Sequence, residues 1–333
     1  MNLLSAAAAL ALTVLAMPVV LAGLRRVRAM DHPNERSSHE VPTLRGGGLG
    51  PIVACFIVTA IVPGLDASAR IALLLVAGGF GLLGAVEDLR GLSPAPRFVV
   101  QMLIAGLAAW VVHPLGNLGT WQVWALAAAG LWLVAYVNAF NFMDGINGLS
   151  AAQVIAGGAG FAVMGAQADS RVLAVAGSLV AGAALGFAPF NFPKARVFLG
   201  DSGSYFFGGW LALLAVLALS AGLPVYAVVS PFLIYLADTG VTLARRVLRG
   251  EAWHQPHRSH VYQRLNQLGW SHPMTTGVVF AAIVACTALG VAAIDSAALG
   301  TGVAVAGMGL LVGIYLASPA LVTRFRARQS VRI

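Results

Sequence analysis

Long apolar runs separated by short polar stretches occupy almost the whole chain. A helix that crosses a bilayer needs about 20 apolar residues, within a range of about 17–25. We expect a transmembrane helix over each of eleven runs: residues 3–22, 46–63, 69–86, 98–113, 123–140, 151–168, 172–190, 205–221, 225–244, 274–293 and 299–318. Several runs are rich in glycine and alanine, which suits close packing in lipid and allows a homodimer. The pattern predicts an all-α integral membrane protein, in which residues 1–333 form a single polytopic domain.

The order of charges around the first run predicts the orientation. No basic residue precedes residues 3–22, and Arg25, Arg26 and Arg28 follow them. This order, with ten further runs behind it, distinguishes the run from a signal peptide and predicts a retained helix with its N-terminus outside. Threaded from that start, all 20 Lys and Arg residues except Arg70 and Arg171 fall on the cytoplasmic side. Because basic residues concentrate there, the threading also predicts a cytoplasmic C-terminus.

Composition agrees with a membrane protein. Hydrophobic residues make up 59% of the chain and charged residues 10%, whereas a soluble protein carries about 25% charged residues. A net charge of +8 would suggest nucleic-acid binding in a soluble protein. Here the basic residues lie beside the membrane, and we expect no nucleic-acid partner. Cys55 and Cys286 both lie in apolar runs, which argues against a disulfide framework or a zinc site.

Polar residues gather in the loops that this threading places in the cytoplasm. These loops cover about residues 23–45, 87–97, 141–150, 191–204 and 245–273. All acidic residues except Asp66, Asp169 and Asp295 lie on or near this side, and those three fall in short outer connections. The sequence therefore predicts an active site on the cytoplasmic face.

Residues that suit ligand binding directly follow the first loop and begin the second. Three glycines, residues 46–48, follow Arg45 and allow close approach of backbone to a ligand or to a neighbouring helix. Glu87 and Asp88 stand together at the end of a span. Neighbouring carboxylates at membrane depth repel each other unless a cation joins them, and Mg²⁺ binds one or two carboxylates with phosphate oxygens. A pair of solvated loop acids is the alternative.

A ladder of polar residues follows the fifth run. Asn138, Asn141, Asp144 and Asn147 lie at three-residue steps. If the helix continues, they share one face, where amides can hold a base, a ribose or a phosphate around one carboxylate. Helix-capping asparagines at the end of a span are the alternative.

Asp201 lies between glycines directly before a span, where Ser202 or Ser204 is a candidate cap for the helix. The positive end of a helix attracts phosphate, and Lys194 and Arg196 add positive charge nearby. A plain capping motif explains the same residues.

The last loop holds His254, His257 and His260, whose spacing suggests zinc. A proline interrupts that spacing, and no cysteine is near. With Arg258 and Arg264 interleaved, an anionic phosphate ligand fits better than a metal.

Asp238 lies inside a span, shortly before the last loop. An acid within the membrane is a functional candidate by default, and an ion pair with Arg245 is its alternative. Such acids also mark the ion paths of transporters, the second class of protein that this composition allows. Because the acids cluster at one face and not at the midplane, an enzyme is favoured.

Five of these segments resemble, in order, the motifs of the polyprenyl-phosphate N-acetylhexosamine-1-phosphate transferases. They are PNERSSHEVPTLRGGG, EDLRGLSP, NAFNFMDGINGLS, NFPKARVFLGDSGS and HRSHVYQRL, within about residues 31–265. The resemblance implies an enzyme of the bacterial inner membrane. It would transfer a sugar 1-phosphate from a UDP-sugar to undecaprenyl phosphate and release UMP, with Mg²⁺ or, in its place, Mn²⁺.

The resemblance also implies roles for individual residues. The catalytic residues would be Asp88, Asp144, Asp201 and His260. The metal ligands would be Asp201, Asp88 and Glu87. Contacts with substrate would come from Asn141, Asn147, Asn191, Phe198, Arg45, Arg97, His257, Arg258 and Arg264. In this scheme Phe198 stacks on the uracil, Asp88 orients or activates the lipid phosphate, and His260 holds the diphosphate together with Arg258.

Three positions depart from the family pattern. Glu87 and Asn147 stand where the family has aspartates, and His257 stands where many members have an aspartate. These differences favour the branch that initiates O-antigen or capsule synthesis, whose donors are N-acetylated amino or deoxy-amino sugars. A phosphotransferase specific for UDP-GlcNAc or for a peptidoglycan precursor is the alternative.

Overall fold

The computed structural model describes residues 2–33, 41–112, 120–251 and 257–330. Residues 34–40 of the first expected inner loop, His113 at the end of an expected span, and His254 lie outside these ranges. Within the described residues, ten helical segments are long and apolar enough to cross a membrane. The expectation of an integral membrane protein built from helices agrees with this finding.

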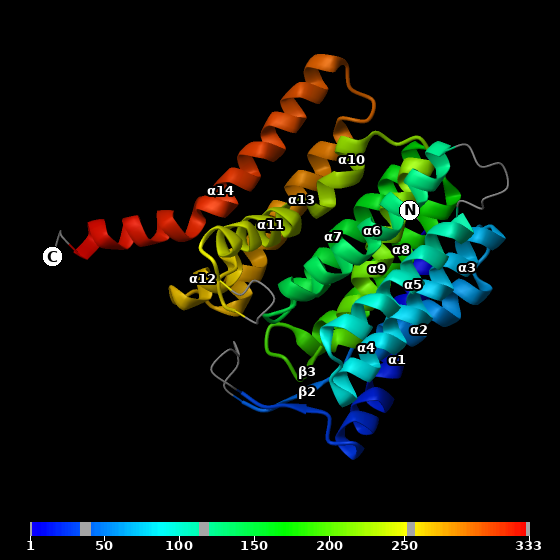
Figure 1. Ribbon diagram of the computed structural model, residues 1–333, viewed down its shortest axis with the longest axis horizontal. Helices are drawn as coiled ribbons and strands as arrows, with labels where there is room; N and C mark the ends of the chain where they lie inside the picture. The colour runs from blue at the N-terminus through cyan, green and yellow to red at the C-terminus, as the bar shows by residue number, and fades with distance from the viewer. Residues whose placement is uncertain (1, 34–40, 113–119, 252–256, 331–333) are drawn as a thin grey trace.

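Most of the long segments follow each other with short connections, whereas residues 27–66 and 249–271 form two longer ones (Figure 1). Two of them are composite: α3 (Ala67–Leu75) continues through the π-helical turn η1 (Val76–Phe80) into α4 (Gly81–Arg90), and α10 (Val225–Val229) continues through η2 (Ser230–Phe232) into α11 (Leu233–Leu248). The others are α1 (Leu3–Arg26), α5 (Pro94–Val112), α6 (Thr120–Met143), α7 (Leu149–Gln167), α8 (Arg171–Asn191), α9 (Gly200–Ser220), α13 (His272–Ala292) and α14 (Ala298–Ser330).

The second expected span is shorter than predicted. It forms α2 (Leu49–Ile61), whose 13 residues extend about 20 Å, against about 30 Å of hydrocarbon. The glycines before α2 are not helical, because Gly47 and Gly48 donate backbone hydrogen bonds to the carbonyls of Phe198 and Leu199, both at 2.9 Å.

A small sheet adds strands to a fold that was expected to be entirely α-helical. Its strands are β1 (Met30–Asp31), β2 (Thr43–Arg45) and β3 (Val197–Phe198), in the order β1-β2-β3. β1 and β2 are antiparallel, and β2 and β3 are parallel with Arg45 opposite Phe198. Figure 1 shows β2 and β3 below the helical bundle, near the end of α4. The sheet therefore joins the first inner loop to the segment that leads into α9.

α9 lies at the centre of the bundle. It packs against α4, α6, α7 and α8, and nearly all of its side chains are buried. α1, α5 and α14 instead expose many apolar side chains, as expected of helices that face lipid. The first turn of α9, where Asp201 lies, is thus fixed from several sides.

Candidate active site

Asp88, at the end of α4, caps the first turn of α9. Its Oδ1 accepts a hydrogen bond from the backbone N–H of Asp201 at 2.8 Å, and its Oδ2 accepts one from that of Ser202 at 3.0 Å. A carboxylate is favourable at this positive end of a helix. The expectation that Ser202 or Ser204 caps α9 is wrong, because the capping group comes from another helix.

A glycine allows α4 to approach α9 this closely. A Cβ atom built on Gly84 would lie 2.2 Å from the carbonyl oxygen of Asp201. A Cβ atom on Gly48 would lie 2.2 Å from the Cα of Gly203, which is also on α9. Gly48, the last glycine of the run 46–48, therefore serves close packing against α9.

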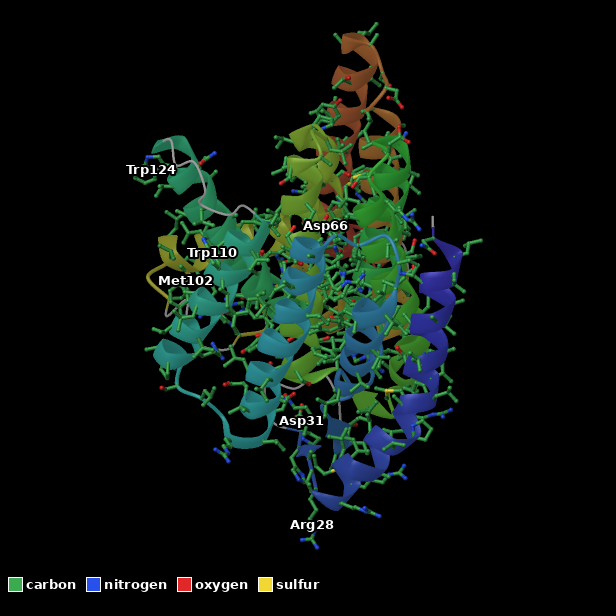
Figure 2. All side chains as sticks on the ribbon, turned by 90° about the vertical axis from the view of Figure 1, so that its right-hand side faces the viewer. Arg28, Asp31, Asp66, Met102, Trp110 and Trp124 are labelled. Carbon is green, nitrogen blue, oxygen red and sulfur yellow. The ribbon has the colours of Figure 1, made fainter. Side chains whose placement is uncertain are left out.

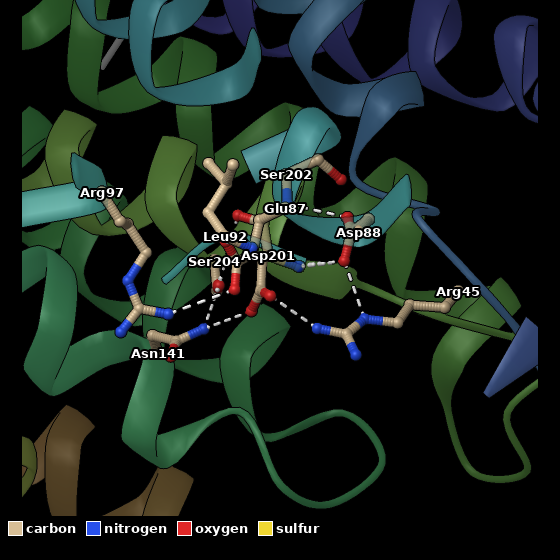
Figure 3. Close-up of polar contacts among 9 residues, drawn as sticks. All are labelled: Arg45, Glu87, Asp88, Leu92, Arg97, Asn141, Asp201, Ser202 and Ser204. Carbon is tan, nitrogen blue, oxygen red and sulfur yellow. Dashed lines mark hydrogen bonds and ion pairs between the residues drawn. The ribbon is translucent and has the colours of Figure 1, made fainter. Parts of the chain in front are cut away.

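Arg45 joins the two aspartates. Its Nε donates to Oδ1 of Asp88 at 2.7 Å, and its Nη2 donates to Oδ2 of Asp201 at 2.6 Å, as Figure 3 shows. Arg45 ends β2, and the pairing of β2 with β3 brings it to the start of α9. Burial lowers the pKa of Arg45, but the negative charges of Asp201 and Asp88 outweigh burial and raise it above its usual value. The guanidinium is therefore a permanent cation in this cluster.

Asn141 holds the other oxygen of Asp201. From the last turn of α6, its Nδ2 donates to Oδ1 of Asp201 at 2.7 Å and to Oγ of Ser204 at 2.9 Å (Figure 3). The side chain of Asp201 is 14% exposed and that of Asp88 is 5% exposed. Arg45, Asp88, Asn141 and Asp201, which we call the α9 cluster, thus come from four segments that are distant in sequence.

The polar ladder is not a single helical face. α6 ends at Met143, so that only Asn138 and Asn141 lie on it. Asn138 donates to Oε1 of Gln101 and to the carbonyl of Val134, both at 2.8 Å, and does not join the α9 cluster.

Asp144 lies in the turn after α6, where its backbone N–H donates to the carbonyl of Asn141 at 3.2 Å. Its Oδ1 accepts a hydrogen bond from Oγ of Ser150 at 2.6 Å. The pKa of Asp144 is raised to about 7, chiefly by burial and also by the charges of Asp201 and Asp88, while the Ser150 hydroxyl and Arg45 oppose the shift. Asp144 therefore belongs to the electrostatic surroundings of the α9 cluster.

Asn147 and Asn191 bond to the backbone of neighbouring loops. Nδ2 of Asn147 donates to the carbonyl of Pro193 at 3.2 Å. Oδ1 of Asn191 accepts from the N–H of Gly148 at 2.6 Å, and its Nδ2 donates to the carbonyl of Val197 at 3.0 Å. Both side chains thereby join the turn after α6 to the segment before α9.

Glu87 points to a different set of partners from Asp88. Its Oε2 accepts from the N–H of Leu92 at 2.9 Å, and its Oε1 lies 3.2 Å from Nη1 of Arg97 (Figure 3). Phe198 is half-buried on β3 opposite Arg45. Arg97 and Phe198 therefore both border the α9 cluster.

The last inner loop is anchored on Asp238. Oδ1 of this buried acid lies 3.0 Å from Nδ1 of His260 and accepts a hydrogen bond from the N–H of Val261 at 3.0 Å. Its Oδ2 accepts a hydrogen bond from the hydroxyl of Tyr315 at 2.6 Å. The expected alternative, a pair with Arg245, is therefore wrong. His260 itself is 2% exposed, so that its pairing with Asp238 fixes the start of α12 (Val261–Gln267).

Two side chains that sequence analysis did not single out connect this loop to the rest of the site. The hydroxyl of Tyr262 donates to the carbonyl of Phe142 at 3.1 Å, and a Cβ atom on Gly145 would lie 2.2 Å from that hydroxyl. Tyr315 reaches Asp238 from α14. The glycine directly after Asp144 was the only signal in the sequence for the first of these contacts.

Three residues of the last inner loop are more exposed than His260: His257, Arg258 and Arg264. The ring of His257 is 4.9 Å from that of His260. Burial, together with the neighbouring His260, lowers the pKa of His257 to about 4. The backbone carbonyl of Arg258 accepts from Gln267 at 3.0 Å. Arg264 lines a separate cavity of about 510 Å³ together with Arg245 and Arg246 of α11 and Arg249, which directly follows that helix.

The donor set suits a metal that is shared with a substrate. No group of three His, Cys, Asp or Glu side chains that could hold a metal ion occurs within the part of the chain that the structure describes. Mg²⁺, however, is commonly bound by one or two carboxylates together with phosphate oxygens and water. Asp201 fits this role, because its carboxylate already faces a cation, the guanidinium of Arg45. Asp88 and Glu87 are more fully engaged with backbone N–H groups and arginines.

Comparison with known proteins identifies the family of this chain. Residues 70–219, which contain Asp88, Asn141 and Asp201, match the model of glycosyl transferase family 4. The probable undecaprenyl-phosphate N-acetylglucosaminyl 1-phosphate transferase of Bacillus subtilis is 31% identical over 287 residues, which cover 81% of this chain and 78% of that protein. The decaprenyl-phosphate N-acetylglucosaminephosphotransferase of Mycobacterium leprae is 33% identical over 289 residues, covering 74% of this chain and 72% of that protein.

A relative that is named for a different sugar is also similar to this chain. The phospho-N-acetylmuramoyl-pentapeptide-transferase of Staphylococcus epidermidis is 30% identical over 239 residues, which cover 63% of this chain and 74% of that protein. These relatives and the family model together show which family the chain belongs to. The chain belongs to glycosyl transferase family 4, within the superfamily of polyprenyl-phosphate hexosamine-1-phosphate transferases.

Proposed function

We propose that this protein transfers a sugar 1-phosphate from a UDP-sugar to undecaprenyl phosphate, giving undecaprenyl-diphosphate-sugar and UMP. The observation that carries the proposal is the α9 cluster, in which two carboxylates, an arginine and an amide converge at the start of a helix. Because Asp88 already accepts the N–H groups of Asp201 and Ser202, phosphate would be held here by Arg45 and a metal and not by the helix start. The cluster lies at the end of the bundle, where a soluble nucleotide and a lipid phosphate can meet.

The distribution of basic residues supports a site on the cytoplasmic side of the membrane. The segments around the cluster carry most of the basic residues, and basic residues concentrate in cytoplasmic loops. We place the site on the cytoplasmic face of the bacterial inner membrane. A UDP-sugar would reach it from the cytosol, and the polyprenyl chain would lie against the apolar side chains that α1 and α5 expose.

Each residue of the α9 cluster would have a different role in the reaction. Asp201 would hold Mg²⁺ together with substrate phosphates, and the metal would neutralise the diphosphate and stabilise UMP as the leaving group. Asn141 keeps the Asp201 carboxylate in place. Asp88 fixes the first turn of α9 and Arg45. The attacking lipid phosphate should have a second pKa of about 6, by analogy with phosphorylated side chains. It is then largely deprotonated at neutral pH and needs no strong general base.

The donor is an N-acetylated amino sugar in this proposal. Two of the relatives carry N-acetylglucosamine in their names, which makes UDP-GlcNAc the first donor to test. The departures at Glu87, Asn147 and His257 support a deoxy-amino sugar and the initiation of O-antigen or capsule synthesis as the second.

A donor panel tests the proposal. Purified protein in detergent would be incubated with Mg²⁺, undecaprenyl phosphate and, in turn, UDP-GlcNAc, UDP-linked N-acetylated deoxy-amino sugars and UDP-MurNAc-pentapeptide, while UMP release is followed. We expect UMP from one donor, dependent on lipid and metal and absent in Asp201→Asn. Folded protein that releases no UMP from any donor would refute the proposal.

A further inference from the structure

We propose that Arg45 occupies the cation position at Asp201 when metal and substrate are absent, and leaves it when they bind. This inference rests on the proposed function, because it assigns the metal to Asp201. It gives Arg45 a role beyond contact with phosphate: the arginine competes with the metal for one carboxylate oxygen.

Both oxygens of Asp201 already have partners. Oδ2 accepts from Nη2 of Arg45 at 2.6 Å, and Oδ1 accepts from Nδ2 of Asn141 at 2.7 Å (Figure 3). Each oxygen keeps a second lone pair that could bind a metal. A divalent cation bound to Asp201 would, however, lie within a few ångströms of the Arg45 guanidinium, and the repulsion between the two cations favours displacement of the arginine.

Arg45 is the side chain that can leave. Asn141 lies at the end of α6 and also donates to Oγ of Ser204, on the same helix as Asp201, at 2.9 Å. Arg45 has a side chain that is 36% exposed. It also holds Asp88 through a different nitrogen, Nε, at 2.7 Å. Rotation of the guanidinium can thus free Oδ2 of Asp201 while the arginine stays anchored on Asp88.

The charges of the cluster favour such an exchange. Asp88 and Asp201 together carry two negative charges when ionised, and Arg45 supplies one positive charge. A divalent cation at Asp201 complements the pair more fully, and the displaced guanidinium then lies beside the metal, where it can grip a phosphate in bidentate fashion. Arg45 would in this way weaken metal binding until a phosphate is present to receive it.

The test is the affinity of the detergent-purified protein for Mn²⁺ alone, measured by electron paramagnetic resonance without nucleotide or lipid. We expect Arg45→Met to bind Mn²⁺ about tenfold more tightly than wild type, since it removes one charge-assisted hydrogen bond that competes with the metal. Arg45→Lys, which keeps the charge but lacks the planar fork that spans the two carboxylates, should fall between them. Asp201→Asn gives the background from other sites.

Arg97→Met is the matched control. Arg97 pairs with Glu87 in the same region, at 3.2 Å, and has no hydrogen bond or ion pair with Asp201. Its loss should change the Mn²⁺ affinity much less than the loss of Arg45. An equal gain in both variants would show a general effect of charge and overturn the inference, as would an unchanged or weaker affinity in Arg45→Met and in Arg45→Lys when both remain folded by size exclusion.

UMP release by the wild type separates this inference from the proposed function. If wild type forms the lipid product and Arg45→Met binds Mn²⁺ no more tightly, the exchange at Asp201 is wrong and the transferase stands. If wild type releases no UMP from any donor, the proposed function fails whatever the affinities for Mn²⁺. We also expect Arg45→Met to lose turnover while it gains metal affinity, since the phosphate loses its arginine.

Discussion

Asp88 acts through the groups that it holds in place. Its two oxygens accept backbone N–H groups of Asp201 and Ser202, and one of them also accepts Nε of Arg45. An acid with these partners, at 5% exposure, is better placed to position α9 than to take a proton from a lipid phosphate. Its identity as part of an acidic pair was visible in the sequence, but the partners come from segments more than 40 residues away.

The pH–rate profile of Asp88→Asn separates the two roles. The amide offers one acceptor in place of two and turns an N–H₂ group toward the N–H groups of α9. We expect turnover to fall by a similar factor at every pH between about 6 and about 9, because positioning does not depend on a proton. Activity that recovers only at high pH would instead identify Asp88 as a general base.

Asp144 should make stability depend on pH. Its pKa is raised to about 7 by burial, whereas an unfolded aspartate titrates near about 3.9. The unfolded chain therefore releases this proton first, and the folded state loses relative stability as the pH rises from about 4 to about 7. We expect the melting temperature of Asp144→Asn, relative to wild type, to increase over that range and then level off. Thermal unfolding in detergent with EDTA measures it; a constant difference would contradict the assignment.

At the scale of elements, hydropathy predicted ten of the long segments but not what joins them. The second run became the short α2, because its glycines pair with residues before α9 and do not extend the helix. The polar ladder divided, because α6 ends at Met143. The sheet of β1, β2 and β3 has strands of two or three residues, too short for any periodic signal. Local patterns thus located the polar motifs, and long-range contacts decided which of them meet.

The contact of α4 with α9 is the element-scale feature most open to test. Gly84→Ala would place a Cβ atom 2.2 Å from the carbonyl oxygen of Asp201, and overpacking of this kind costs about 1–3 kcal/mol. We expect a lower melting temperature and a loss of turnover, since the cluster moves with α9. Gly106→Ala on α5, where nothing lies within 4 Å of the new Cβ atom, is the control and should leave both unchanged. Equal behaviour of the two variants would rule out a special role for the close approach.

At the scale of the whole molecule, Arg28 and two exposed tryptophans lie toward opposite ends. Figure 2 shows Arg28 and Asp31 at one end of the molecule and Asp66, Trp110 and Trp124 toward the other. The side chain of Trp110 is 45% exposed and that of Trp124 is 69% exposed, as suits indole rings at a membrane boundary. The basic end holds the α9 cluster. The α9 cluster thus lies at the end that the threading of charges predicts to be cytoplasmic.

Labelling with a membrane-impermeant maleimide tests that orientation. The native cysteines, Cys55 and Cys286, are buried, whereas Ala67, the first residue of α3, and Ser93, between α4 and α5, are exposed. We expect Ala67→Cys to react in intact spheroplasts and Ser93→Cys to react only after permeabilisation. Reaction of Ser93→Cys in sealed spheroplasts would place the α9 cluster on the outer face and exclude cytosolic UDP-sugars as donors.

The most direct test of the whole scheme follows the β-phosphate of the donor. Purified protein would be incubated with Mg²⁺, undecaprenyl phosphate and UDP-GlcNAc, or the donor selected from the panel, labelled with ³²P in the β-phosphate. We expect the label to move into the lipid extract together with the sugar, with UMP left in water, and to remain in the donor when Asp201→Asn is used. Sugar that reaches the lipid while the label stays in UDP would contradict phosphosugar transfer at the α9 cluster.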